Sequence, residues 1–426
     1  MADFWDRELS ATMASICIGL SVPLSQIGIS YTTSLLAAAC LFVLLHYDRW
    51  RCISEAARAL KSPVGVSLAI VFAAWIPSLF TSIDPGKSLQ VWARTAAYLA
   101  LGALLWAFLR GESVRLQICR RALFVASALS VFLIAVNFLG GTEYVRILRF
   151  KEFVEGYPTL VMKLYAAPAA CLVPILICVG WCWARSALIV GIGLALALIF
   201  FSYLTKSGSA VVGLAFGFYC AGVTWWGRRD GRIVLIGMAF LLFSLVAWYV
   251  LFALSDPITV TLQQLGHDFN YPFTLDQHRQ LIWQFILSKL PDAIWTGYGI
   301  DAINKLPEAG EIIPILGGER LPSHPHSWVF EVLAETGIVG FVPFICALGT
   351  AFYTVCRRAL KGSQPALAAT GLFGVYFGAG LFSFSFWASW WQLVFIAFWA
   401  ILAAMDELHR EDTVQPDAKC PQEWRK

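Results

Sequence analysis

Long apolar segments constrain this chain more than any other feature of its sequence. A helix needs about 20 consecutive apolar residues to cross the hydrocarbon core of a bilayer, and such windows recur along most of the 426 residues. Only 14% of the residues are charged, against roughly a quarter in an ordinary soluble domain. We therefore predict an all-α polytopic membrane protein with about twelve spanning helices. The expected spans are 12–29, 31–47, 64–82, 90–109, 119–140, 158–182, 187–204, 208–226, 233–254, 334–356, 365–387 and 389–405.

Basic residues in the short loops predict the orientation of these spans, because lysine and arginine resist export. With both termini in the cytoplasm, four basic clusters fall on the cytoplasmic side; they are Arg49/Arg51/Arg58/Lys61, Arg110/Arg115/Arg120/Arg121, Arg228/Arg229/Arg232 and Arg357/Arg358/Lys361. The expected parts of the chain are a helical bundle at 1–254, a periplasmic domain at 255–326, three more helices at 327–405 and a cytoplasmic tail at 406–426.

About a third of the lysines and arginines fall on the exported side, which this rule disfavours. They are Lys87, Arg94, Arg146, Arg149, Lys151, Lys163, Lys206, Arg279, Lys289, Lys305 and Arg320. Several lie at the ends of apolar segments, where a charge is costly unless it is paired or lines a wet cavity. Each one alone could snorkel to the lipid headgroups, but their recurrence over several helices favours a shared anion site.

Other classes of protein fit the sequence poorly. The net charge of +4 is small and dispersed, and the aromatic residues lie inside apolar runs, so nucleic-acid binding is disfavoured. The exported loop contains no cysteine, so no disulfide framework is expected. The first apolar stretch lacks a basic leader and a small-residue cleavage site, and we expect it to be a retained helix.

The exported loop is expected to contain ordered structure. Residues 277–295 place Ile282, Trp283, Ile286, Leu287 and Leu290 near one face at helical spacing, which predicts an amphipathic helix broken at Pro291. The following Gly297-Tyr298-Gly299 predicts a turn in which the backbone bends sharply or approaches another segment closely.

The most specific pattern lies where the exported loop meets the membrane. His326-Ser327 is followed, after nine residues, by Gly337-x-x-Gly340. This pattern resembles the signature of the O-antigen ligases, within a superfamily that includes O-antigen polymerases and protein O-oligosaccharyltransferases. Arg279-x-x-x-Trp283 upstream also resembles that superfamily. Thr205-Lys206-Ser207-Gly208 is similar to its helix-end motif, although many relatives carry an arginine one or two positions later.

The resemblance implies a GT-C-like glycosyltransferase of the bacterial inner membrane. Its donor would be O-antigen polysaccharide on undecaprenyl diphosphate, and its acceptor a sugar of the lipid A-core at the periplasmic face. The resemblance also implies a reaction that inverts the anomeric centre in one displacement, without metal or cofactor. Because both substrates are lipid-anchored, the active site is expected to open toward the membrane lipids.

Such a transfer needs a base for the acceptor hydroxyl, cations for the departing diphosphate, and exclusion of water. His326 is the candidate base, since the pKa of a free imidazole, about 6.5, lies near ambient pH; a helix cap or core histidine is the alternative. Arg279 offers a planar fork for phosphate oxygens, and such cations would also lower the pKa of a neighbouring histidine. Further candidates for the diphosphate or glycan are Lys206, Arg146, Arg149, Lys87, Arg94, His324 and Glu331.

Two of these candidates have a second interpretation. His324 and His326 form a His-x-His pair that could bind zinc with His267 or His278, but the ligand spacing is not compact, so no metal site is predicted. Glu331 and Glu335 share a helix face and could orient His326 or bind acceptor hydroxyls. Equally, they could form a solvated first turn favoured by the helix dipole.

Three other functions stay open. An O-antigen polymerase would share the donor, although polymerases tend to have two comparable exported loops. A protein O-oligosaccharyltransferase would carry a larger exported region near its C-terminus. A secondary transporter of an anionic substrate is the alternative from another class, but the sequence shows neither an inverted repeat nor paired broken helices.

Overall fold

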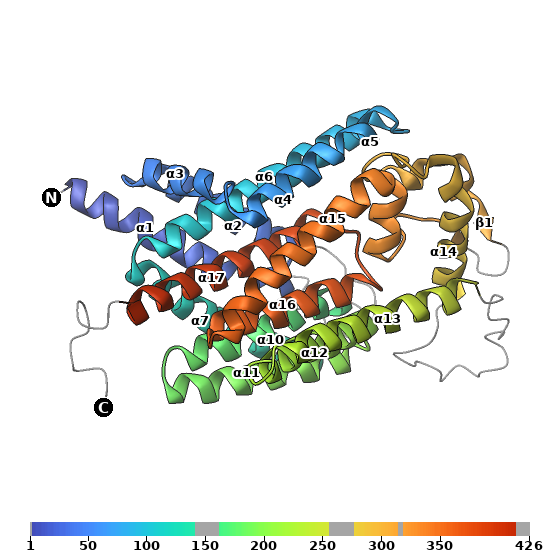
Figure 1. Cartoon of the computed structure of the whole chain (residues 1–426). Coiled ribbons are helices and arrows are strands. Elements are labelled where there is room, and N and C mark those ends of the chain that lie inside the picture. The colour runs from blue at the N-terminus through green and yellow to red at the C-terminus, as the bar shows by residue number, and fades with distance from the viewer. Residues whose placement is uncertain (1, 141–161, 255–276, 314–317, 415–426) are drawn as a thin grey trace.

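Long helices lying side by side make up the computed structural model, which describes residues 2–140, 162–254, 277–313 and 318–414 (Figure 1). The helices before the predicted exported domain are α1 (Ala2–Ser21), α2 (Ile29–Leu45), α3 (Arg49–Ala59), α4 (Pro63–Ala74), α5 (Ile76–Phe80), α6 (Pro85–Arg110), α7 (Ser113–Gly140), α10 (Ala166–Trp181), α11 (Arg185–Leu204), α12 (Gly208–Trp226) and α13 (Arg232–Leu254). They are followed by α14 (Gln277–Lys289), β1 (Ile312–Ile313), β2 (Gly318–Glu319), α15 (Trp328–Leu360), α16 (Gln364–Gly380) and α17 (Ser389–Val414). Short 3-10 turns lie at Pro23–Gln26, Lys163–Tyr165, Leu290–Ala293, Ile303–Lys305 and Pro307–Gly310.

The structure confirms an all-α polytopic membrane protein, but the predicted count of twelve is not reached. In the described part of the chain, nine helices are long and apolar enough to cross a membrane, or ten if α2 and α3, bent by 116°, form one span. Every predicted window overlaps a helix. The first window runs through Pro23, where α1 has already ended, and the window at 365–387 runs past Gly380, where α16 ends. Apolar residues in the connecting turns made both windows look longer than their helices.

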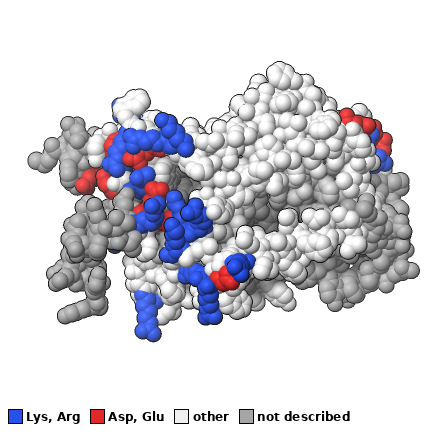
Figure 2. Space-filling view, viewed as in Figure 1, with Lys and Arg blue, Asp and Glu red and all other residues white. Residues whose placement is uncertain are grey.

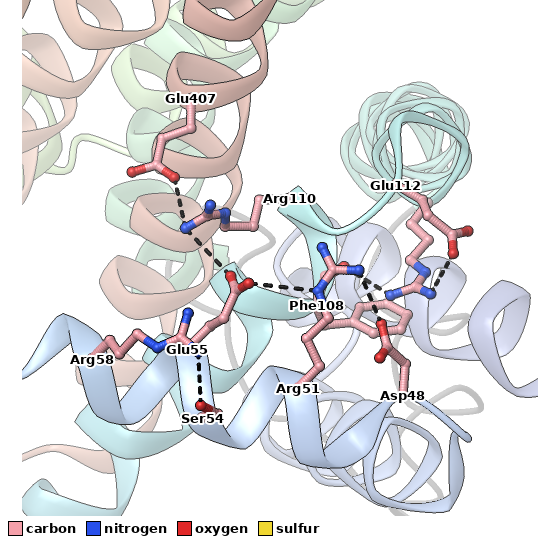
Figure 3. A network of polar contacts seen from close by, with 10 residues as sticks. Asp48, Arg51, Ser54, Glu55, Arg58, Phe108, Arg110, Glu112 and Glu407 are labelled. Carbon is pink, nitrogen blue, oxygen red and sulfur yellow. Dashed lines mark hydrogen bonds and ion pairs between the residues drawn. The ribbon is translucent and has the colours of Figure 1, made fainter.

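Charged side chains gather at the two ends of the bundle and leave a broad uncharged band between them (Figure 2). The four basic clusters meet at the end that we call the basic end. There Arg110 pairs with Glu55 of α3 at 3.4 Å and with Glu407 of α17 at 3.1 Å (Figure 3). Arg358 pairs with Asp406 at 2.7 Å. These pairs neutralise acidic residues on α17, and that helix continues to Val414, past the expected end of its span at 405.

The opposite end carries α14 and the two-stranded sheet of β1 and β2 (Figure 1). As predicted, α14 is amphipathic and stops before Pro291; Ile282, Trp283 and Ile286 are buried on its inner face. They pack with Phe252 of α13 and Phe330 of α15 in one apolar cluster. Burial of this face holds α14 over the ends of two spanning helices.

Two backbone segments cross at glycines beside this cluster. Tyr298 N donates to Ala334 O at 3.0 Å, and Ile338 N donates to Ile294 O at 2.9 Å. Gly297 and Gly337 both have positive φ, of 71° and 62°, and a Cβ on Gly337 would lie 2.3 Å from the Trp295 carbonyl. Only glycine fits such a contact, so Gly297 and Gly337 allow the segment after α14 to cross α15 in direct backbone contact.

Candidate active site

The histidines lie in an extended segment that leads into α15. Trp283 Nε1 donates to Pro325 O at 2.9 Å, so α14 fixes the backbone between the two rings. His326 itself has a positive φ of 56°, which costs of order 1–3 kcal/mol for a residue with a side chain and is concentrated at functional sites. The fold therefore holds this imidazole in one direction at an energetic cost.

Both imidazoles contact a single backbone oxygen. His324 Nε2 and His326 Nδ1 each lie 2.9 Å from Ser383 O, which belongs to the turn between α16 and α17. Because a carbonyl can only accept, each of these ring nitrogens carries the hydrogen. The neutral tautomer of His326 then has its basic nitrogen at Nε2, while the Nδ1 of His324 accepts from Ser323 Oγ at 2.8 Å. The two rings thus differ: His324 uses both nitrogens to brace the segment, whereas Nε2 is the nitrogen of His326 that can accept a proton.

Glu331 and Glu335 lie one helical turn apart on α15 and are 1% and 2% exposed. The solvated first turn considered for them is therefore wrong. Glu331 Oε2 accepts from Phe386 N at 2.6 Å. Glu335 accepts from Asp301 N at 2.7 Å and from the indole of Trp387. The two carboxylates hold the 383–387 turn and the loop after Gly299 against α15, and so position the carbonyl that both histidines use.

Two of the basic candidates on α6 join this assembly. Lys87 Nζ lies 3.3 Å from a carboxylate oxygen of Asp301. Arg94 Nη2 donates to Trp387 O at 2.7 Å, and its buried Nε has no hydrogen-bond partner among the residues described. Arg94 thus keeps one buried donor without a partner, whereas the charge of Lys87 is already balanced by Asp301.

Arg279 is brought to the same place by α14. It lies one turn before Trp283, and its charge acts on His324, whose pKa is lowered mainly by burial and further by this guanidinium. Lys206, with a positive φ of 50°, is exposed between α11 and α12. A Cβ on Gly213 of α12 would lie 3.0 Å from Ala379 Cβ near the end of α16. Lys206 therefore lies at the same end of the bundle as the turn between α16 and α17.

Among the described residues, two further cations of the predicted exported set pair with carboxylates. Arg146, Arg149 and Lys151 lie outside the described residues. Lys289 pairs with Glu308 at 2.6 Å, and Arg320 with Glu311 at 2.9 Å, in the segment around β1 and β2. Because these cations are already paired, we expect the shared anion site to contain fewer of the basic residues than the sequence predicted.

The sequence reasoning missed Asp301, the Ser383 carbonyl and Trp387. Asp301 follows Gly299 in a turn, and its own positive φ of 55° has no sequence signal. The turn at 381–388 was hidden in a predicted span, although Ser383 and Ser385 break its apolar run. Across the described ranges no three His, Cys, Asp or Glu side chains form a group able to hold a metal.

Acidification is expected to destabilise the folded protein through His324. Burial and Arg279 lower the pKa of His324 below 6.5, although the Ser383 carbonyl and Asp301 act in the opposite direction. The unfolded chain therefore binds a proton that the folded chain resists, and stability falls as pH drops below about 6.5. Melting temperatures of the purified protein between about pH 8 and pH 5 should fall less in His324→Gln, which keeps a donor for Ser383 O. An unchanged slope in that variant would contradict this assignment.

Comparison with known proteins agrees with the motif. Residues 192–345 match the family model described as O-antigen ligase. A candidate polysaccharide ligase of Rickettsia prowazekii is 32% identical over 141 residues, which are 32% of this chain and 33% of the relative. One from Rickettsia conorii is 30% identical over 118 residues, 27% of this chain and 28% of the relative. The alignments thus span a third or less of these relatives' length. The match over 192–345, which includes Arg279, His324, His326 and Glu331, therefore shows that this region of the chain is similar to the O-antigen ligase family.

Proposed function

We propose that this protein is an O-antigen ligase that transfers polysaccharide from undecaprenyl diphosphate to the lipid A-core at the periplasmic face of the inner membrane. The observation that carries the proposal is the hydrogen bond from Nδ1 of His326 to Ser383 O, which leaves Nε2 as the basic nitrogen. Arg279 acts electrostatically on the neighbouring His324, and Arg94 binds the same turn through Trp387 O. The end of the bundle with α14 would then face the periplasm, and the basic end the cytoplasm.

The histidine would act on the acceptor sugar. As the acceptor oxygen forms its bond to the anomeric carbon, the bond from that carbon to the diphosphate oxygen breaks. The hydroxyl proton passes to Nε2 of His326, and the hydrogen on Nδ1 stays with Ser383 O. The bond to Ser383 stabilises the imidazolium that forms, because a carbonyl accepts more strongly from a charged donor.

The cations would act on the leaving group. Undecaprenyl diphosphate gains negative charge as it departs, and preoriented donors stabilise such charge more in a water-poor site than in water. Arg279 can bind two phosphate oxygens at once, and the charge of Arg94, which is held on Trp387 O, adds to the positive potential there. Lys87 would contribute less, since Asp301 already pairs with it. Arg146, Arg149 and Lys206 remain candidates for the rest of the diphosphate or for the glycan.

Lipopolysaccharide from a strain that lacks this protein tests the proposal. We expect the gel to show lipid A-core without O-chains, with lipid-linked polymer accumulating, and the wild-type gene to restore the ladder. Arg279→Ala, present in the membrane at the wild-type amount, should fail to restore it. Core capped with a single repeat would indicate a polymerase instead, and an unaltered ladder would favour transport.

A further inference from the structure

A cavity lies between α10, α12 and α16 in the half of the bundle nearest the basic end. Its volume is about 150 Å³, and its walls are apolar, with Pro174 and Cys178 on α10, Leu214 and Ala221 on α12, and Ala368 on α16 among them. An apolar cavity of roughly this size stays dry and binds a hydrocarbon as large as benzene. The space therefore suits a few methylene groups better than water or a polar ligand.

Small and kinking residues create this space. Pro174 lies inside α10, and a Cβ on Gly371 would meet the Cβ atoms of Pro174 and Ala221 at 3.3 and 3.6 Å. Larger side chains at these positions would close the gap between the three helices. The cavity is thus a consequence of particular residues at the helix crossing.

A positive side chain lies beside the end of the cavity at which α16 begins. Arg228 donates to Ala359 O at 2.9 Å and to Ser363 O at 3.3 Å, and Ser363 precedes the lining residue Gln364. A guanidinium has five donors, so Arg228 keeps others for a ligand.

The acidic group at this end is already occupied. Asp406 acts on Cys178, but it accepts hydrogen bonds from Arg358 and Ser363. Asp406 therefore does not neutralise Arg228, which leaves a positive charge beside the apolar cavity.

Exposed tryptophans mark this level of the bundle as the border between hydrocarbon and headgroups. Trp181, which lines the cavity, is 60% exposed, and Trp225 and Trp226 at the end of α12 are 54% and 58% exposed. Tryptophan is enriched at that border in membrane proteins. An anionic headgroup at the cationic end would then place its hydrocarbon beside the cavity.

We propose that this cavity holds part of an acyl chain of an anionic phospholipid, whose phosphate binds Arg228. Arginine forks bind phosphate oxygens bidentately, and basic sites between helices on the cytoplasmic side bind anionic headgroups. The donor lipid of the proposed reaction places its diphosphate at the other end of α16, near Gly380, so it does not meet both requirements. The site is separate from the histidines and does not depend on the proposed ligase activity.

Melting temperatures of the full chain in a neutral detergent test this site. Dioleoyl-phosphatidylglycerol is expected to raise the melting temperature by about 3 °C or more, and dioleoyl-phosphatidylcholine to leave it unchanged. Ala221→Leu fills the cavity and Arg228→Gln removes the charge, so both variants should lose the rise. Gly222→Leu, which faces open space, and the exposed Arg229→Gln should keep it.

Several outcomes would overturn the proposal. An equal rise with phosphatidylcholine would show that Arg228 does not select an anionic headgroup. A full rise in Ala221→Leu would show that the lipid binds elsewhere. A rise with undecaprenyl phosphate and none with phosphatidylglycerol would assign the cavity to the donor lipid. If Ala221→Leu does not fold, a rise retained by Arg228→Gln is sufficient to reject the phosphate contact.

Discussion

His326→Ala is expected to reduce glycan transfer by about 10²- to 10⁴-fold, the usual contribution of a general base. The variant keeps the backbone of the segment, because His324, Pro325 and Trp283 still make their own contacts. The loss should therefore appear in the turnover number, with little change in donor binding. Transfer from a lipid-diphosphate donor by purified protein, measured under single-turnover conditions, provides the rate.

His324→Gln is the matched control for this prediction. Its ring is 4.2 Å from that of His326 and donates to the same carbonyl, but both of its nitrogens are used in bracing the segment. It should lose far less activity than His326→Ala at neutral pH. Equal losses in the two variants, or normal transfer by His326→Ala in a protein with a wild-type melting temperature, would reject His326 as the base.

Gly337→Ala is expected to destabilise the protein by about 3 kcal/mol or more. The residue has φ 62° and ψ −175°, a conformation that is essentially restricted to glycine, and a Cβ would overlap Trp295 and Thr296 backbone atoms at 2.3–2.5 Å. The backbone contact between α15 and residues 294–299 would open. The segment that carries His324 and His326 would then be less firmly held. The melting temperature and the yield of monodisperse protein measure this loss.

Gly349→Ala, in the same helix, separates this effect from the general cost of changing a glycine. An added Cβ there meets nothing within 4 Å, and alanine is the better helix former by about 1 kcal/mol. We expect Gly349→Ala to be as stable as the wild type or slightly more so. Similar destabilisation by both substitutions would show that the crossing at Gly337 carries no special constraint.

The helical architecture was predictable because apolar segments long enough to cross a bilayer recur along most of the sequence. Helix ends were less predictable. Ser383 and Phe386 look like part of a span, and only the contacts of their backbone with the histidines and Glu331 show that they form a turn. Tertiary hydrogen bonds of this kind have no local periodicity, so hydropathy cannot locate them.

Motif residues of the candidate site could be predicted from the sequence, whereas residues that only the fold brings together could not. His326, Arg279, Gly297 and Gly337 were singled out from sequence patterns. Asp301 and Trp387 were not, since their importance comes from Glu335, which binds both from a different helix. The basic residues predicted to be exported do not all point to the candidate site, because Lys289 and Arg320 pair with acidic side chains around β1 and β2 instead.

The reliance of both imidazoles on one main-chain oxygen has an evolutionary consequence. No side-chain replacement at position 383 can delete that acceptor, so the residue identity there is free to drift. A one-residue insertion or deletion between α16 and α17 would instead misalign both rings together. Natural variants of this protein should therefore conserve the length of the 381–388 connection more strictly than its composition.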